Sequence, residues 1–305
     1  MSNETTKGVS EIKFNELIAD LWQKKITIIV STIVGFIIML VIGLSLPDYY
    51  RSEVTLVPSE SSNKSMLPIG GELGSIATLA GLDVGQQGID KTQLALEIIQ
   101  SRRFINEFAA NRQILPDLIA YDEWVKEGRR NLYDDELYDA NSQQWVETQG
   151  GTQFQPSTAR IYKEFTELLT IETDKNTGVI RIAVKHFSPD IAQKWTEWLI
   201  EDINSEMRKR DVQEARNSIR FLESELKNVT YSEMQRVFFQ LMESQLKTIM
   251  LADVRPEYAL QTIDPAVVPE RPSEPNRIII SFLGLLLGGF VGVVIALNTG
   301  KRKAI

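Results

Sequence analysis

Two long apolar runs lie at opposite ends of this 305-residue chain, at residues 26–46 and 278–297. Neither run contains a charged residue. About 20 apolar residues in a helix cross the roughly 30 Å hydrocarbon core of a bilayer, and a helix satisfies its backbone polar groups internally. We therefore expect two transmembrane helices that bracket a polar domain.

The charged residues beside these runs predict the orientation. Lys24 and Lys25 precede the first run, and Lys301, Arg302 and Lys303 follow the second. Loops rich in Lys and Arg stay in the cytoplasm, so we expect both termini there and the central domain in the periplasm. The expected segments are a cytoplasmic N-terminal segment (1–25), a transmembrane helix (26–46), a periplasmic domain (47–277), a second transmembrane helix (278–297) and a cytoplasmic tail (298–305).

A cleaved signal peptide is the alternative interpretation of the first run. Gly43-Leu44-Ser45 resembles the small-x-small pattern of a cleavage site. The apolar run is 21 residues long, however, and signal peptides have an apolar region of about 7 to 15 residues. The length therefore favours a transmembrane helix.

The composition of the central domain limits its chemistry. Residues 47–277 carry 37 Asp and Glu against 26 Lys and Arg, a net charge of −11, which disfavours binding to nucleic acid or to anionic lipid headgroups through bulk charge. The chain has no Cys and a single His, His186, which excludes disulfides, thiolate nucleophiles and the usual zinc sites. We therefore expect no catalytic residue, no cofactor, no metal site and no nucleic-acid partner.

Three segments of the central domain have the pattern of strands. Residues 49–58 (YYRSEVTLVP) are rich in β-formers, and residues 258–268 look like a returning strand. Two alternating runs within residues 169–187 flank a loop at 174–178, which predicts a β-hairpin. His186 shares a face with apolar neighbours on the second strand, so we expect a structural role for it.

Other segments of the domain give weaker signals. Residues 90–115 have helical spacing, and the acidic, Tyr-rich residues 121–141 predict short helices or loops at the surface. The Gly-rich residues 59–88 predict a loop. No Gly-Lys-Ser/Thr follows that loop, so it is not a phosphate-binding loop.

Residues 190–253 contain neither Pro nor Gly, which predicts one or two very long helices. A single helix of that length would extend roughly 90 Å, and the likeliest break is Val229-Thr230-Tyr231, which are poor helix formers. Apolar residues recur in three- and four-residue steps before that break, as in a coiled coil; they are Val212, Ala215, Ile219, Leu222, Leu226 and Val229. Such a seam needs a partner, either another segment of the chain or a second copy.

Two further patterns lie near the second apolar run. Gly284, Gly288 and Gly292 form overlapping GxxxG steps, which let two membrane helices approach closely. Pro269, Pro272 and Pro275 are spaced by three and would align on one face of a polyproline II helix. As candidates for packing between copies we select the three glycines together with Ile219, Leu222 and Leu226.

Taken in order, these features resemble the polysaccharide co-polymerase family, the chain-length determinant (Wzz) proteins of Gram-negative lipopolysaccharide O-antigen synthesis. The resemblance runs end to end. It is carried by residues 17–24 (LIADLWQK), the strand at 49–58, the long polar helix through Arg216 and Leu222, and the Pro269-x-x-Pro272-x-x-Pro275-Asn276-Arg277 segment before a glycine-rich span.

The resemblance implies an α+β protein of the inner membrane, in which two transmembrane helices bracket a periplasmic domain with an α/β membrane-proximal base and a long extended helix. It implies a ring-like homo-oligomer that acts with the O-antigen polymerase on undecaprenyl-linked glycan and sets the modal number of repeat units without enzymatic activity. These properties are expectations from the family.

Three alternatives stay open at this point. A kinase-regulated exopolysaccharide or capsule export subunit is the nearest; related proteins carry a cytoplasmic kinase domain, and only residues 298–305 follow the second run here, although some kinases are separate chains. A two-span sensor would need a cytoplasmic signalling module. A glycosidase would need two carboxyl groups across a cleft, whereas Asp134-Asp135-Glu136 and Glu201-Asp202 are adjacent carboxylates of the kind found on solvated faces.

Overall fold

The structure is a computed structural model, and its described part falls into two compact units, residues 1–48 with 272–305 and residues 49–271. It describes residues 22, 24–59, 91–125, 130–147, 154–228 and 231–301. The Gly-rich loop and most of the N-terminal segment lie outside the described residues. The predicted limits of the cytoplasmic, membrane and periplasmic segments stay predictions.

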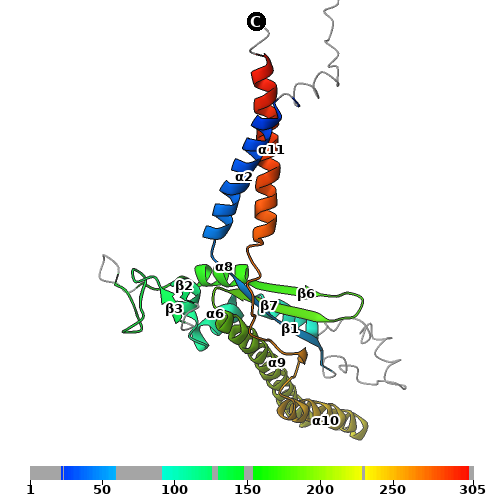
Figure 1. The fold of residues 1–305 in the computed structure, drawn as a ribbon. Helices are drawn as coiled ribbons and strands as arrows, with labels where there is room; N and C mark the ends of the chain where they lie inside the picture. The colour runs from blue at the N-terminus through cyan, green and yellow to red at the C-terminus, as the bar shows by residue number, and fades with distance from the viewer. Residues whose placement is uncertain are drawn as a thin grey trace, which may run out of the picture. The chain divides into compact units, whose positions relative to one another are not determined.

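The first unit is a pair of apolar helices, α2 (Lys25–Ser45) and α11 (Arg277–Lys301), which pack against each other (Figure 1). Both are long and apolar enough to cross a membrane, with mean hydropathies of 2.8 for Lys25–Ser45 and 2.7 for Arg277–Leu297. Most of their Ile, Leu, Val and Phe side chains are exposed. Such an exposed apolar surface suits helices surrounded by lipid, and the two predicted helices are confirmed.

The second unit is built on a four-stranded antiparallel sheet with the strand order β6-β7-β1-β8. The strands are β1 (Tyr50–Pro58), β6 (Leu169–Thr173), β7 (Ile180–His186) and β8 (Leu260–Asp264). The three predicted strand regions are thus confirmed. Gly178 has a φ of 70° in the β6–β7 loop, a left-handed conformation that glycine adopts without steric cost.

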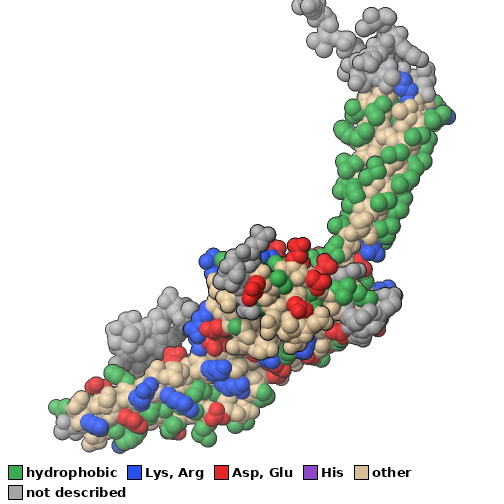
Figure 2. Space-filling view, turned by 90° about the vertical axis from the view of Figure 1, so that its left-hand side faces the viewer, with side chains coloured by type: hydrophobic (Ala, Val, Ile, Leu, Met, Phe, Trp, Pro, Cys, Tyr) green, Lys and Arg blue, Asp and Glu red, His purple; other side chains and the backbone are tan. Residues whose placement is uncertain are grey.

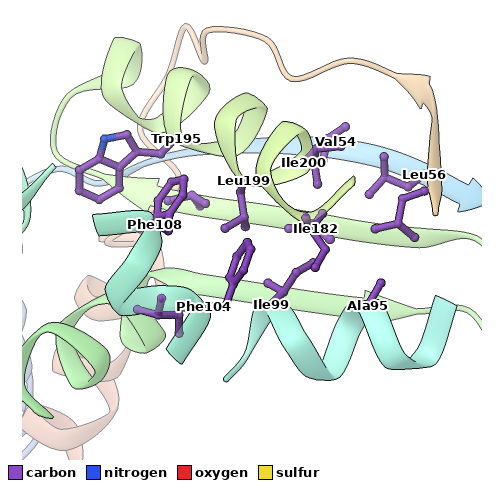
Figure 3. Packing of buried hydrophobic residues seen from close by; sticks show 14 of the residues in the cluster. Val54, Leu56, Ala95, Ile99, Phe104, Phe108, Ile182, Trp195, Leu199 and Ile200 are labelled. Atoms are coloured by element: carbon purple, nitrogen blue, oxygen red, sulfur yellow. The ribbon is translucent and has the colours of Figure 1, made fainter. Parts of the chain in front are cut away.

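One face of this sheet is apolar and is covered by helices (Figure 3). Leu56 and Ile182 of the sheet and Trp195 and Leu199 of α9 belong to one buried cluster, and all four side chains are at most 1% exposed. Phe104, from the preceding helices, completes the same cluster. Full burial of one such side chain contributes about 1.5–3 kcal/mol, so this layer is the main source of stability of the second unit.

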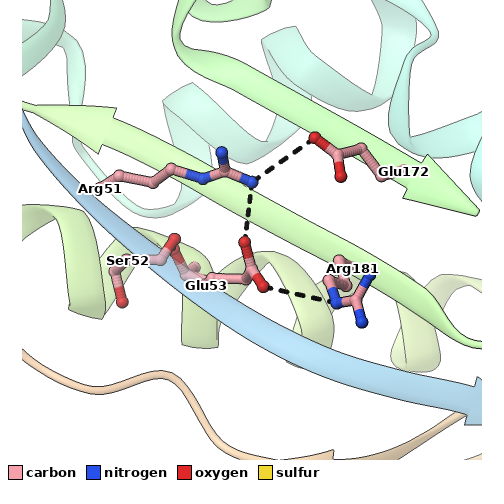
Figure 4. Close-up of polar contacts among 6 residues, drawn as sticks. Arg51, Ser52, Glu53, Glu172 and Arg181 are labelled. Atoms are coloured by element: carbon pink, nitrogen blue, oxygen red, sulfur yellow. Dashed lines mark hydrogen bonds and ion pairs between the residues drawn. The ribbon is translucent and has the colours of Figure 1, made fainter. Parts of the chain in front are cut away.

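The opposite face of the sheet is polar (Figure 4). Arg51 pairs with Glu53 at 2.7 Å and with Glu172 at 3.7 Å, and Arg181 lies 3.7 Å from the other oxygen of Glu53. These side chains are 29–56% exposed, and such pairs contribute roughly 0–1 kcal/mol each. The alternation of apolar and charged residues along β1 therefore fixes which face meets the helices.

Four short helices accompany the sheet, and the start of one of them is explained by an N-terminal cap. They are α5 (Lys91–Ile99), α6 (Arg102–Asn111), α7 (Leu115–Ile119) and α8 (Thr158–Leu168). The predicted helix at 90–115 is therefore interrupted. Ser101 caps α6 by accepting a hydrogen bond from the Phe104 backbone N–H at 3.2 Å, which is a preferred start for a helix.

The acidic, Tyr-rich segment forms strands, so the prediction of short helices or loops was wrong there. Its strands are β2 (Tyr121–Val125), β3 (Arg130–Tyr133), β4 (Tyr138–Asp139) and β5 (Gln144–Trp145). Tyr121 packs on Tyr133 across the β2–β3 pair at 6.0 Å between ring centroids, and Tyr138 packs on Trp145 across β4–β5 at 5.3 Å. Aromatic pairs of this kind stabilise neighbouring strands.

The chain then forms a long helical hairpin of α9 (Pro189–Leu226) and α10 (Ser232–Val254), which we call the arm. The predicted break is confirmed, although residues 229–230 lie outside the described residues. α9 has 38 residues and extends about 57 Å. Because residues 227–231 are a short connection, α10 turns back along α9 and packs against it (Figure 1).

Candidate functional site: two helix-packing surfaces

The three glycines selected from the sequence lie where α11 meets α2 of the same chain. A Cβ atom added at Gly288 would lie 2.6 Å from the carbonyl oxygen of Ser31, and one added at Gly292 would lie 2.9 Å from the Cα atom of Ile28. At Gly284 the added atom would lie 2.8 Å from the carbonyl oxygen of Gly35. No larger side chain fits at these positions unless the helices separate, as expected for a GxxxG seam.

Gly35 completes this seam from the side of α2, and sequence reasoning missed it. A Cβ atom there would lie 2.7 Å from both the carbonyl oxygen of Gly284 and the Cα atom of Gly288. Ser31 adds a hydrogen bond from its Oγ to the carbonyl oxygen of Gly288 at 2.8 Å, and such bonds between membrane helices contribute about 0.6 kcal/mol. The first span contains two glycines, Gly35 and Gly43, but they are eight residues apart and form no GxxxG step that would mark Gly35 as a packing position.

Polar contacts tie the two helices together near both ends. The Lys24 ammonium donates to the carbonyl oxygen of Ala296 at 2.7 Å. At the other end Arg277 pairs with Asp48 at 2.8 Å. The glycine seam is therefore occupied by the chain's own first span. Packing of these glycines between copies stays a prediction, and it would require α2 and α11 to separate.

The seam predicted on α9 also has a partner within the chain. Ile219, Leu222 and Leu226 are half-buried on α9, and α10 packs against that helix. A cavity of about 460 Å³ between the helices is lined by Leu222 and Leu241, among others. Burial along α10 follows steps of four and three residues; the buried or half-buried members are Phe238, Met242, Gln245, Ile249 and Ala252. A coiled coil between copies stays a prediction.

A second face of α10 is apolar and has no cover within the described chain. Phe239, Leu246, Met250 and Val254 are 56%, 52%, 69% and 78% exposed, and their spacing of seven, four and four places them on one stripe of the helix. We call these four residues the α10 stripe. Soluble surfaces rarely expose contiguous apolar patches unless something binds there, so the stripe is the second candidate surface of the arm.

The proline segment lies between β8 and α11. Within residues 265–276, all of them described, the backbone forms no helix and only one bridge residue. Pro269 and Pro275 are half-buried and Pro272 is exposed, and the Glu274–Pro275 peptide bond is cis. A contact of this segment with another molecule stays a prediction.

His186 is held inside the second unit by hydrogen bonds at both ring nitrogens. The Ser188 backbone N–H donates to Nδ1 at 3.0 Å, so Nε2 carries the proton and donates to the carbonyl oxygen of Asp117, also at 3.0 Å. Burial lowers the pKa of His186 to about 4 despite these contacts, because a buried imidazolium would lose its hydration. The expected structural role of His186 agrees with this geometry.

Asp117 extends the same buried cluster toward β3. Burial raises the pKa of its carboxyl group, while the hydrogen bond donated by the Tyr133 hydroxyl at 2.6 Å opposes that shift. The pKa of Tyr133 is raised, mainly by burial and to a smaller extent by the same hydrogen bond with Asp117. The cluster thus joins α7, β3 and β7 in one polar network, in which His186 is buried and Asp117 and Tyr133 are half-buried.

The adjacent carboxylates considered for catalysis have structural partners. Arg112 donates to both oxygens of Asp202, at 2.6 and 3.1 Å, and to Glu201 at 2.8 Å. Asp134 accepts a hydrogen bond from the Glu136 backbone N–H at 2.9 Å, as in a local turn. In the part of the chain that the structure describes, no cluster of three or more His, Asp or Glu residues is placed to hold a metal ion.

Comparisons with known proteins agree with the features described above. Residues 10–111 match the family model described as "Wzz: Chain length determinant protein", and this match confirms the resemblance drawn from the sequence. A comparison with proteins of curated function found no significant match.

Solved structures similar to the chain include a "full-length bacterial polysaccharide co-polymerase", at 15% identity and a TM-score of 0.40, covering 96% of this chain and 99% of that one. Another is a "Fragment of WzzB, Polysaccharide Co-polymerase from Salmonella Typhimurium", at 13% identity and a TM-score of 0.32, covering 75% of this chain and 100% of that one.

Proposed function

We propose that this protein regulates the chain length of a surface polysaccharide, as a non-enzymatic scaffold of several copies in the bacterial inner membrane. The observation that carries the proposal is the match of residues 10–111 to the chain-length determinant family. The polymer we assign is the O-antigen of lipopolysaccharide. Its polymerase and the undecaprenyl-linked glycan are then the partners.

The membrane arrangement follows from the two apolar helices. α2 and α11 have the length and hydropathy of membrane spans. Lys residues flank each span on the side nearer the chain terminus. Positive flanks favour cytoplasmic termini, which leaves residues 47–277 in the periplasm.

The arm supplies the surface through which copies would assemble. The α10 stripe exposes four large apolar side chains, and burial of one such side chain against a second copy contributes up to about 1.5–3 kcal/mol. Copies arranged side by side through their arms would hold the polymerase or the growing glycan at a surface of fixed size. Chain length would then follow from the geometry and copy number of the assembly.

A scaffold role also agrees with the state of the candidate chemical groups. Glu201 and Asp202 are engaged by Arg112, and the single His is buried and hydrogen-bonded at both nitrogens. These groups therefore stabilise the fold where they stand.

The direct test is deletion of the gene in the source organism, followed by complementation and a gel that resolves surface polysaccharide by length. We expect the deletion to remove the modal band of lipopolysaccharide and leave short, randomly distributed chains, and the complemented strain to restore the band. Loss of length control in a capsule or exopolysaccharide, with an unchanged lipopolysaccharide ladder, would replace the O-antigen by that polymer. Unchanged lengths of every surface polysaccharide would overturn the proposal.

A further inference from the structure

A polar groove runs between α6 and α9. It consists of two adjoining cavities of about 320 and 530 Å³, and both are lined by Glu206 and Lys209. The α9 residues that line it extend from Asp202 to Asn217, a distance of about 22 Å along the helix. Figure 2 shows Lys and Arg side chains in a row along the helical arm, interspersed with acidic ones.

The groove is electrically neutral, in contrast to the domain that contains it. Its lining includes four Lys or Arg and four Asp or Glu side chains, whereas residues 47–277 carry a net charge of −11. Amide and hydroxyl groups of Asn111, Ser205 and Gln213 lie among the charges. Both cavities therefore offer hydrogen-bond donors as well as acceptors.

One end of the groove is rigid. The Arg112 guanidinium is held by Asp202 in a two-pronged contact and also by Glu201, and it lies 5.0 Å from the ring centroid of Trp198. The hydrogen bond with Asp202 raises the pKa of Arg112, so its charge is fixed. On the same wall, within α6, Arg103 pairs with Glu107 at 2.8 Å.

The centre of the groove is open for a ligand. Among the described residues Lys209 makes no ion pair, and its side chain is exposed, so its three donors face water. Glu206, one turn earlier on α9, lines the same two cavities and offers acceptors. A donor and an acceptor thus stand side by side at the point where the two cavities meet.

We infer that this groove binds a stretch of the surface polysaccharide itself, an inference that rests on the proposed function. A sugar hydroxyl both donates and accepts hydrogen bonds, which matches a lining that holds ammonium and guanidinium donors and carboxylate acceptors in equal number. A polyphosphate or nucleic acid chain would need an excess of cations, and an apolar helix would find no apolar stripe. The groove is longer than one sugar ring, so a linear glycan lies along it, and each copy holds the polymer on its arm.

The test compares the full-length protein in lipid nanodiscs with two groove variants and two matched controls. Lys209→Ala and Glu206→Gln change the centre of the groove. Arg216→Ala and Glu223→Gln make the same charge changes at exposed positions of α9 that do not line it. The probe is polysaccharide released by mild acid from the source organism's surface, with binding followed by saturation-transfer NMR and calorimetry.

We expect each groove variant to weaken binding about tenfold, the effect of losing one hydrogen bond to a charged group, and to shift the modal length in cells, while both controls bind as the wild type does. Equal binding by all five proteins, or no binding by the wild type, would overturn the inference. This result is distinguishable from failure of the proposed function, because a deletion strain that loses its modal length upholds length control even when the groove variants bind normally.

Discussion

Substitution of Gly288 by Ala tests whether the glycine seam holds α2 and α11 together within one chain. The added methyl group would lie 2.6 Å from a backbone oxygen of Ser31 and 3.0 Å from the Cα atom of Thr32, so neither neighbour can turn away as a flexible side chain would. Forcing an extra methyl group into a packed interface costs about 1–3 kcal/mol. The shift would also lengthen the hydrogen bond from Ser31 to the Gly288 carbonyl oxygen.

Gly289 is the matched control on the same helix. A Cβ atom there would meet only the Thr32 hydroxyl oxygen, at 3.4 Å, a contact that a small side-chain movement relieves. We therefore expect Gly289→Ala to change the stability of the helix pair by no more than about 0.5 kcal/mol.

The chain has no cysteine, so an introduced pair gives an unambiguous assay. A Cβ atom at Gly43 would lie 3.8 Å from the Cβ atom of Ile280, within the roughly 3.5–4.5 Å range of a disulfide. In membranes, a Gly43→Cys/Ile280→Cys protein should oxidise within the monomer, as counted by a maleimide reagent that adds mass to each remaining thiol. Gly288→Ala should slow this reaction and Gly289→Ala should not; equal rates, or cross-linked dimers in place of monomers, would refute the intrachain seam.

Two further predictions concern the second unit. Burial lowers the pKa of His186 from its usual 6.5 to about 4, so the unfolded chain binds a proton more readily than the folded protein does. The free energy of unfolding should therefore fall by about 3 kcal/mol as the pH falls from 6.5 to 4. Burial raises the pKa of Asp117, so this residue has the opposite effect on stability at the acid end of the range. Denaturant titrations of the full-length protein at several pH values check this, and a His186→Gln variant with the same dependence between pH 6.5 and 5 would contradict it. Asn204 is 3% exposed and joins α9 to β8 by accepting from the Ala259 and Leu260 N–H groups at 2.8 and 2.9 Å and donating to the Leu260 carbonyl oxygen at 3.0 Å. Asn204→Ala should lower the free energy of unfolding by about 3 kcal/mol, because the backbone groups that it contacts would stay buried without partners. Asn228→Ala, at an exposed position, should leave the denaturation midpoint unchanged. Equal midpoints for the two variants would show that the hydrogen bonds of Asn204 contribute nothing to stability.

The sequence was sufficient for features that depend on local pattern. Uninterrupted apolar length predicted both membrane helices, and the alternation in residues 169–187 predicted the β6–β7 hairpin. The absence of Pro and Gly from residues 190–253 predicted the long helices of the arm, and the poor helix formers Val229-Thr230-Tyr231 predicted the break between them. Each of these signals comes from residues close together in the chain, so no knowledge of distant contacts was needed.

Features that depend on distant contacts could not be predicted in the same way. The Tyr-rich strands after α7 are stabilised by aromatic pairs such as Tyr138 with Trp145, and the acidic residues between them concealed the alternation. Gly35 carries no repeat that identifies Gly284 and Gly288 as its neighbours. The groove between α6 and α9 brings together residues that are 89 and 90 positions apart, Arg112 with Glu201 and Asp202. Their spacing in the sequence does not predict this contact.

The central claim is that assembly through the arm sets the length of the polysaccharide. The most direct measurement determines, in the same cells, the mass of the protein complex extracted in native nanodiscs and the modal polysaccharide length, for Met250→Glu in the α10 stripe and for Gln240→Glu on another exposed face of α10. We predict that Met250→Glu changes both the mass and the modal length, because a carboxylate on the stripe disfavours burial against a second copy, and that Gln240→Glu changes neither. A complex that loses copies while the modal length stays at its wild-type value would contradict the account.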